Sequence, residues 1–95
     1  MPAKPRRLRL SRTRVEQAVR ETKTKQIVHM VGGTESLDDG RKQVLVHLLD
    51  KFDDPRAESP AAAELIAALE RDGWTVAHRR AVVASRLVVT EPEED

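Results

Sequence analysis

Apolar side chains recur with a helical period between residues 59 and 73. Ser59 precedes them as a candidate N-cap, Pro60 occupies the first helical position, and Gly73 follows the last turn. The apolar positions, three or four residues apart as on one face of a helix, are Ala62, Leu65, Ile66 and Leu69. This pattern predicts the clearest helix of the chain.

A second helical period is found in residues 36–52. Its apolar members, which fall on one face of a 3.6-residue repeat, are Val44, Leu45, Leu48, Leu49 and Phe52. Ser36 is a candidate N-cap, and Asp38 and Asp39 would occupy the first turn, where the helix dipole favours acids. We expect this helix to end before Pro55, because the residue preceding a proline avoids the helical conformation.

Residues 13–31 form the third candidate helix. One side of it would carry Val15, Ala18, Val19 and Thr22. Residues 27–31, with the sequence IVHMV, are also typical of a strand, so the end of this helix stays open. Gly32 and Gly33 then stop it, since glycine is costly inside a helix.

The segment 74–90 decides the fold class. Five valines favour a strand there, but a hairpin is expected to have Gly, Asn, Asp or Pro at its turn, and residues 75–90 contain none. One unbroken strand of that length would exceed the usual three to ten residues. We therefore prefer a helix over about residues 78–88, and strands over 74–90 remain the alternative.

These elements predict a mainly α fold, a small helical bundle with a helix-turn-helix that is winged in one version; the alternative is an α+β fold. The chain divides into a flexible basic arm at 1–14, a single domain at 15–90 and an acidic disordered tail at 91–95. The arm has two prolines, six cations and no acid in MPAKPRRLRLSRTR, so it cannot bury enough apolar surface to fold alone.

The basic end of this predicted helix resembles a known DNA-binding region. RRAVVASR at 79–86 is similar to the RRTVAKYR core of the enhancer-dependent, nitrogen-regulation sigma factor, with matches at Arg79, Arg80, Val82 and Arg86. Residues 44–87 also resemble the N-terminal domain of arginine repressors. The sigma factor's Thr, Lys and Tyr are replaced here by Ala81, Ala84 and Ser85. The resemblance implies a helix-turn-helix and DNA contact.

Charge is segregated along the chain, although the net charge is only +1. Residues 1–25 carry nine Lys and Arg against two acids, and residues 26–72 carry five against ten. Residues 73–90 add three arginines and no acid. Two basic zones therefore bracket an acidic middle, as expected of a surface that faces a polyanion.

The sequence offers no set of residues for catalysis. Cysteine is absent, and His29, His47 and His78 are not in a metal-ligand spacing. The acid pairs Asp38/Asp39 and Asp53/Asp54 are explained by capping and turn chemistry. We expect no enzyme activity, no cofactor and no metal, and Trp74 is expected to anchor a turn in the core. Without an apolar segment long enough for a bilayer, we expect a cytoplasmic protein that binds no membrane.

The candidate DNA contacts lie in the two basic zones. Arg79 and Arg86 would contact base edges or phosphates, since a guanidinium can bond guanine in two places, and Ser85 and His78 would add hydrogen bonds. The cations of the arm would neutralise phosphates. These are Arg6, Arg7, Arg9, Arg12 and Arg14.

Two functions from different classes stay open. The first is a small DNA-binding protein, either a transcription regulator or a phage or plasmid accessory factor, with double-stranded DNA as its partner. The second is an α+β protein-binding module that docks on a larger assembly such as a polymerase, a ribosome or a viral particle. The acidic helices at 36–72 are candidates for a protein partner, and a homodimer through residues 13–31 is compatible with the sequence.

Overall fold

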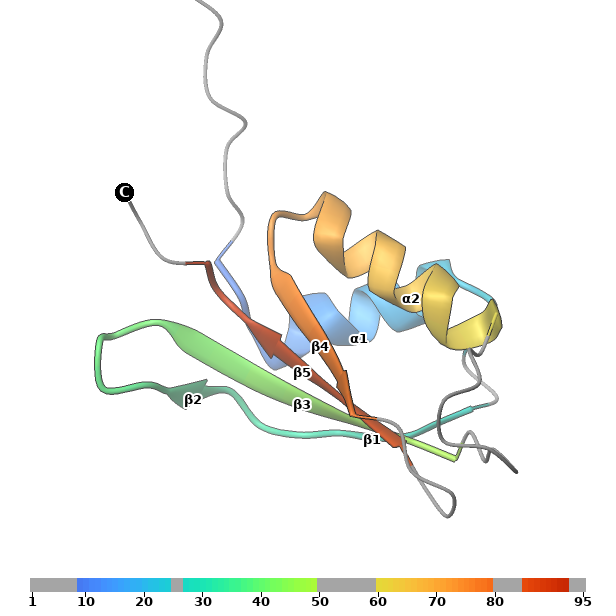
Figure 1. Cartoon of the computed structure of the whole chain (residues 1–95), viewed down its shortest axis with the longest axis horizontal. Coiled ribbons are helices and arrows are strands. Elements are labelled where there is room, and N and C mark those ends of the chain that lie inside the picture. Colours follow the sequence, from blue (N-terminus) through green and yellow to red (C-terminus); the bar gives the residue numbers. More distant parts are fainter. Residues whose placement is uncertain (1–8, 25–26, 50–59, 80–84, 93–95) are drawn as a thin grey trace, which may run out of the picture.

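The fold is an α+β arrangement of two helices and a five-stranded antiparallel sheet. The computed structural model describes residues 9–24, 27–49, 60–79 and 85–92. In chain order the elements are α1 (Arg12–Glu21), β1 (Val28–Val31), β2 (Glu35–Ser36), β3 (Lys42–Leu48), α2 (Pro60–Arg71), β4 (Thr75–Arg79) and β5 (Ser85–Thr90). The strand order is β1-β3-β5-β4, with β2 also paired to β3, and both helices lie on the same side of the sheet (Figure 1).

The expectation of a mainly α bundle with a helix-turn-helix is therefore wrong, and the α+β alternative agrees with the structure. The predicted helix over residues 36–52 is replaced by a hairpin and β3, and the predicted helix over residues 78–88 is replaced by the ends of β4 and β5. The helix-turn-helix implied by the sigma-factor resemblance is not formed in this part of the chain.

A tight turn explains why residues 36–48 form a hairpin. Gly40 adopts φ +87, which favours glycine, and the Leu37 N–H donates to the Arg41 carbonyl over 2.7 Å. Asp39 accepts the Arg41 N–H at 3.1 Å and the Arg41 Nε–H at 2.6 Å. Asp-Gly is a strong hairpin signal, so the acids that we assigned to a helix start belong to a chain reversal.

The pairing of β4 with β5 corrects the other prediction. Five residues join Arg79 to Ser85. A connection of that length is commonly built around a type I turn, which accepts most residue types, so a hairpin needs no Gly or Asn there. The valines then favour the extended conformation, as their propensity indicated.

Two predictions from the helical pattern are confirmed. The helix α2 spans Pro60–Arg71, and Gly73 just beyond it adopts φ +94. Trp74 is buried in the core directly after this glycine. The Ser59 cap and the chain stop at Pro55 lie outside the described residues.

The first helix is shorter than the candidate segment. It ends at Glu21, because the Thr22 hydroxyl and backbone N–H both bond to the Val19 carbonyl. Residues 28–31, at the strand-like end of that segment, form β1. The helix begins with Ser11 as N-cap, whose hydroxyl accepts the Arg14 N–H.

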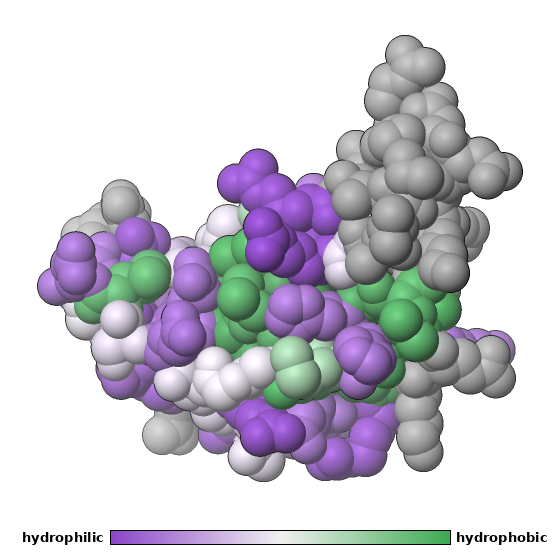
Figure 2. Space-filling view, turned by 90° about the horizontal axis from the view of Figure 1, so that it is seen from below, coloured by the Kyte–Doolittle hydropathy of each residue, from purple (hydrophilic) through white to green (hydrophobic). Residues whose placement is uncertain are grey.

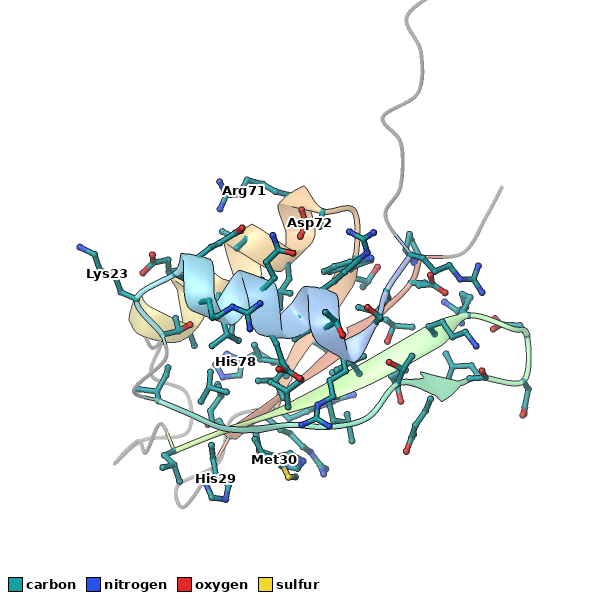
Figure 3. All side chains as sticks on the ribbon, turned by 180° about the vertical axis from the view of Figure 1, so that it is seen from behind. Lys23, His29, Met30, Arg71, Asp72 and His78 are labelled. Atoms are coloured by element: carbon teal, nitrogen blue, oxygen red, sulfur yellow. The ribbon has the colours of Figure 1, made fainter. Side chains whose placement is uncertain are left out.

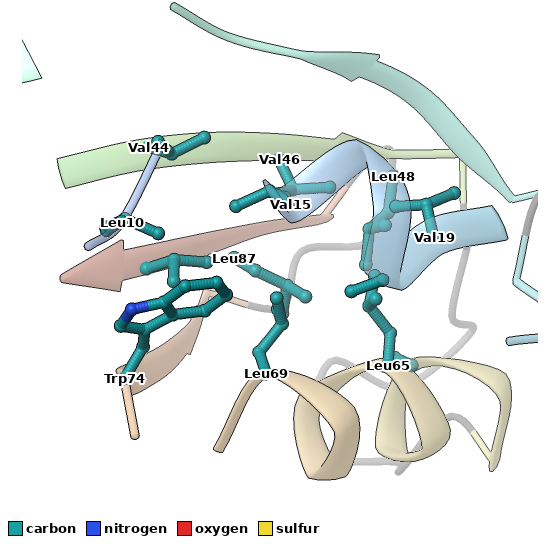
Figure 4. Packing of buried hydrophobic residues seen from close by; sticks show 13 residues of the cluster. Leu10, Val15, Val19, Val44, Val46, Leu48, Leu65, Leu69, Trp74 and Leu87 are labelled. Atoms are coloured by element: carbon teal, nitrogen blue, oxygen red, sulfur yellow. The ribbon is translucent and has the colours of Figure 1, made fainter. Parts of the chain in front are cut away.

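The hydrophobic core fills the space between the helices and one face of the sheet (Figure 4). Along β3 and β5 every second side chain points into it, as the two-residue period of a strand requires. The fully buried members with the largest aliphatic side chains are Leu10, Val15, Val44, Val46, Leu48, Leu65, Leu69, Leu87 and Val89. The core therefore depends on Val and Leu, with Trp74 as its aromatic member.

The N-terminal segment is fastened to the end of β5 by one carboxylate. Glu91 accepts the Leu10 N–H at 3.1 Å and the Lys42 N–H at 2.6 Å, and its side chain is only 13% exposed. The Arg9 Nε lies 3.6 Å from the same carboxylate. Residues 10–14, which we assigned to the flexible arm, thus belong to the folded body.

Candidate nucleic-acid interface

The face of the sheet that points away from the helices is not covered by either of them. Met30 and His29 lie on this side in Figure 3, whereas His78 lies between the sheet and the helices. Viewed from this side, hydrophobic residues reach the surface between hydrophilic ones (Figure 2). We call this surface the open face.

Strand register arranges the open face in three rows that cross β4, β5 and β3 in that order, since directly opposed residues share a face. The polar row is Thr75, Thr90 and Gln43, the apolar row is Ala77, Val88 and Leu45, and the basic row is Arg79, Arg86 and His47. Met30 on β1 pairs with His47 and continues the basic row to the other edge.

The basic row brings two guanidinium groups together. Arg79 and Arg86 are directly opposed on neighbouring strands, and both are exposed. Among the described strand residues, the only acid paired onto this face is Glu35, opposite Gln43. Gln43 is four residues from His47 along β3, or about 14 Å. Like charges directly opposite each other destabilise a sheet, so this pair is a site where a bound anion would relieve repulsion.

The structure separates the residues that we predicted as one DNA-contacting group. Arg79 and Arg86 share the open face. His78 pairs with Leu87 and Ser85 pairs with Leu48, so both point to the helix side, and Ser85 is buried. They cannot accompany the two arginines on one surface, because adjacent residues of a strand point to opposite faces.

The arm residues lie at the opposite end of β5. Arg9 is paired with Glu91, and the Arg12 Nε lies 2.8 Å from the Glu16 carboxylate. Arg14 is exposed on α1. From Arg86 to Glu91 the strand advances by about 17 Å, so these cations form a second basic zone away from the basic row. Arg6 and Arg7 lie outside the described residues.

Sequence reasoning missed His47, Leu45 and Met30 as members of the open face. They reach it only through the pairing of β3 with β1 and β5, which joins distant segments of the chain. The local signal was the alternation of Val44 and Val46 with the residues between them, and it was masked by a helical period over the same positions.

The open face presents no aromatic side chain from the described strands. Trp74 is 4% exposed in the core, and Phe52, the other aromatic of the sequence, lies outside the described residues. Stacking of unpaired bases relies mainly on such rings. The chemistry available on the open face is therefore guanidinium, imidazole, amide, hydroxyl and aliphatic.

Comparison with known proteins gives no relative: no protein-family model, curated protein or solved structure matches the chain. Within the described ranges, no helix is long and apolar enough to cross a membrane. In the same residues, no three His, Cys, Asp or Glu side chains gather into a group that could hold a metal ion.

Proposed function

We propose that this protein binds double-stranded nucleic acid through the phosphate backbone, using the open face of its sheet. Arg79 and Arg86 contact neighbouring phosphate oxygens, and His47 and the hydroxyl and amide groups of the polar row add hydrogen bonds. The protein acts as a small non-catalytic binding factor, with DNA as the first partner to test.

The observation that carries this proposal is the direct opposition of Arg79 and Arg86 on an exposed face, with no acid in their row. A guanidinium pair of this kind holds one anion between two planar donor groups. A phosphate placed there removes the repulsion between the strands and gains charge-assisted hydrogen bonds.

The lack of aromatic rings on the open face supports a duplex over a single strand, because single-strand binders stack bases on such rings. A flat sheet face also differs from a helix that fills the major groove, where bases are read. Binding is therefore expected to depend steeply on salt and weakly on sequence.

The arm adds a second contact with the backbone. Arg14 is exposed, whereas Arg9 and Arg12 are already engaged by Glu91 and Glu16. These exposed ion pairs are weak and can exchange a carboxylate for a phosphate. With the two zones about 17 Å apart, they would reach different phosphates of one duplex.

The test is fluorescence anisotropy of a labelled DNA duplex between about 50 and 200 mM salt, where backbone binding changes most. We expect Arg79→Ala with Arg86→Ala to weaken binding at low salt at least tenfold. The slope of log affinity against log salt should fall in magnitude by about 0.9 for each lost phosphate contact. An RNA duplex measured in parallel distinguishes the two polymers.

The matched control is Arg20→Ala with Arg71→Ala, which removes the same charge from exposed positions on α1 and α2. We expect this control to change binding less than threefold. Equal losses in both double variants would show that only total charge matters. No binding by the unaltered protein at low salt would remove the proposal.

A protein partner on the same face is the second candidate, and exposed hydrophobic side chains favour it. Met30 is 50% exposed at the end of the basic row, and Leu49 just beyond β3 is 53% exposed. Methionine and arginine are enriched at protein interfaces. This candidate predicts binding that survives high salt and is lost in Met30→Lys, opposite to the expectation for nucleic acid.

A further inference from the structure

The two edges of the sheet differ in regularity. At one edge β1 has a register shift between Val28 and Met30, and residues 32–34 separate β1 from β2. At the other edge β4 pairs with β5 at every position from Thr75 to Arg79 without a shift. Bulges and interruptions protect an edge from pairing with other strands, so β4 is the less protected edge.

The composition of β4 gives it little further protection. Its sequence TVAHR contains no proline, glycine or lysine, and its one full charge is Arg79 at the end. As the last strand in the order β1-β3-β5-β4, it has an outer side on which an edge strand presents backbone N–H and C=O groups.

Burial on the helix side also changes at β4. In β3 and β5 the inward residues Val46, Leu87 and Val89 are fully buried, whereas the inward residues of β4, Val76 and His78, stay partly exposed. Val76 packs against the core while part of its surface remains open. A strand added beside β4 would cover this remaining apolar surface.

We propose that β4 pairs antiparallel with β4 of a second copy of this chain, giving a two-fold symmetric dimer with a continuous sheet. Ala77 lies at the symmetry axis, opposite Ala77 of the second copy. Symmetric pairing is the commonest route to a soluble dimer, and it closes after two copies so that no open chain of molecules forms.

The register about Ala77 is self-complementary. Thr75 is opposite Arg79 of the second copy, and Val76 is opposite His78, so no two like charges face each other across the new pair. The smallest side chain of the strand meets itself at the axis, where two bulky or charged residues would be forced together. The proposal concerns the edge of the sheet and does not depend on nucleic-acid binding.

The most direct test uses Ala77→Cys, because the natural chain has no cysteine. Opposed residues of an antiparallel pair have Cα atoms about 4.5–5.5 Å apart, within the range that a disulfide bridges. We expect rapid formation of a covalent dimer under mild oxidation. Ala67→Cys, at an exposed position of α2, is the control and should cross-link at least tenfold more slowly.

A charge exchange gives an independent readout. Sedimentation of the unaltered protein should show a reversible, concentration-dependent dimer, and Ala77→Lys or Ala77→Glu alone should be monomers because like charges meet at the axis. An equimolar mixture of the two variants should recover the dimer, which a folding defect would not allow.

Three results would overturn the proposal. They are a monomeric unaltered protein at all concentrations, equal cross-linking of the two cysteine variants, or dimers that survive in each charge variant alone. A dimer with a third protein's strand in place of a second copy would leave the purified chain monomeric and so falls under the first of these results. All readouts are taken without nucleic acid, so they do not bear on the proposed function.

Discussion

The two faces of the sheet are made by the same strands but are subject to opposite demands. In β5, Leu87 and Val89 point to the helices and are fully buried, while Arg86, Val88 and Thr90 point away from them. The inner face selects volume and shape, since a close-packed interior admits few voids. The outer face tolerates two opposed arginines that no core would accept.

This difference shows how a small chain with few aromatic residues separates stability from binding. Residues of alternating position carry one or the other role, so neighbours in sequence should respond differently to the same substitution. The following variants test that separation, beginning with the largest expected effect.

Val89→Ala and Val88→Ala make the same chemical change on opposite faces. Val89 is fully buried, and its truncation should lower the free energy of unfolding by about 2–3 kcal/mol, from two lost methylene equivalents and the cavity they leave. Val88 is half-buried in the apolar row, and we expect a loss below about 1 kcal/mol. Urea denaturation measures both, and equal losses would contradict the assignment of faces.

Glu91→Ala sharpens the comparison on the helix side, where this carboxylate holds the N-terminal segment. Its loss leaves the Leu10 and Lys42 N–H groups without their acceptor. Because the side chain is 13% exposed and water can reach the site, we expect a destabilisation of about 1–2 kcal/mol. Glu16→Ala, which removes only an exposed pair with Arg12, should cost less than about 0.5 kcal/mol in the same denaturation assay.

Arg79→Glu should stabilise the protein while abolishing nucleic-acid binding. The new carboxylate faces Arg86, so a repulsive cross-strand pair becomes attractive, and the gain is expected to be about 0.2–1 kcal/mol. Thermal unfolding and duplex binding of the same sample measure the two effects. A variant that loses stability together with binding would place Arg79 in the structural part of the molecule.

Asp39→Asn has the smallest expected effect and depends on pH. The backbone N–H and the guanidinium of Arg41 hold the pKa of Asp39 below its ordinary value of 3.8. The charged form is therefore favoured in the folded state, and its contribution is present above about pH 4 and is lost as pH falls through the lowered pKa. The difference in melting temperature between the protein and the variant should shrink toward zero below about pH 3. A difference that is independent of pH would exclude the charge of Asp39 as its cause.

The sequence predicted some elements because their signals are local. Pro60, Gly73 and the apolar period between them define α2 without reference to the rest of the chain. In β3, by contrast, the apolar residues fit a helical and a strand period equally, and only the Asp39–Gly40 turn and the pairing with distant strands decide between them. Non-local pairing is the information that a local pattern lacks.

The predicted pair Arg79 and Arg86 lies on one surface for a reason other than the one we gave. Seven residues apart, they would share a face of a helix, and the register of the β4–β5 hairpin also places them opposite each other. His78 and Ser85 have the same spacing but point to the helix side, because the sheet separates neighbours that a helix would keep together. His47 could not be assigned to this surface from local sequence at all.

The central claim is that the open face binds a polyanion, and an NMR titration of the labelled protein with a short DNA duplex tests it most directly. The account predicts that backbone amide shifts at Arg79, Arg86 and His47 move first and in proportion, and that salt reverses them. Shifts confined to the exposed sides of α1 and α2, with the basic row unchanged, would contradict it.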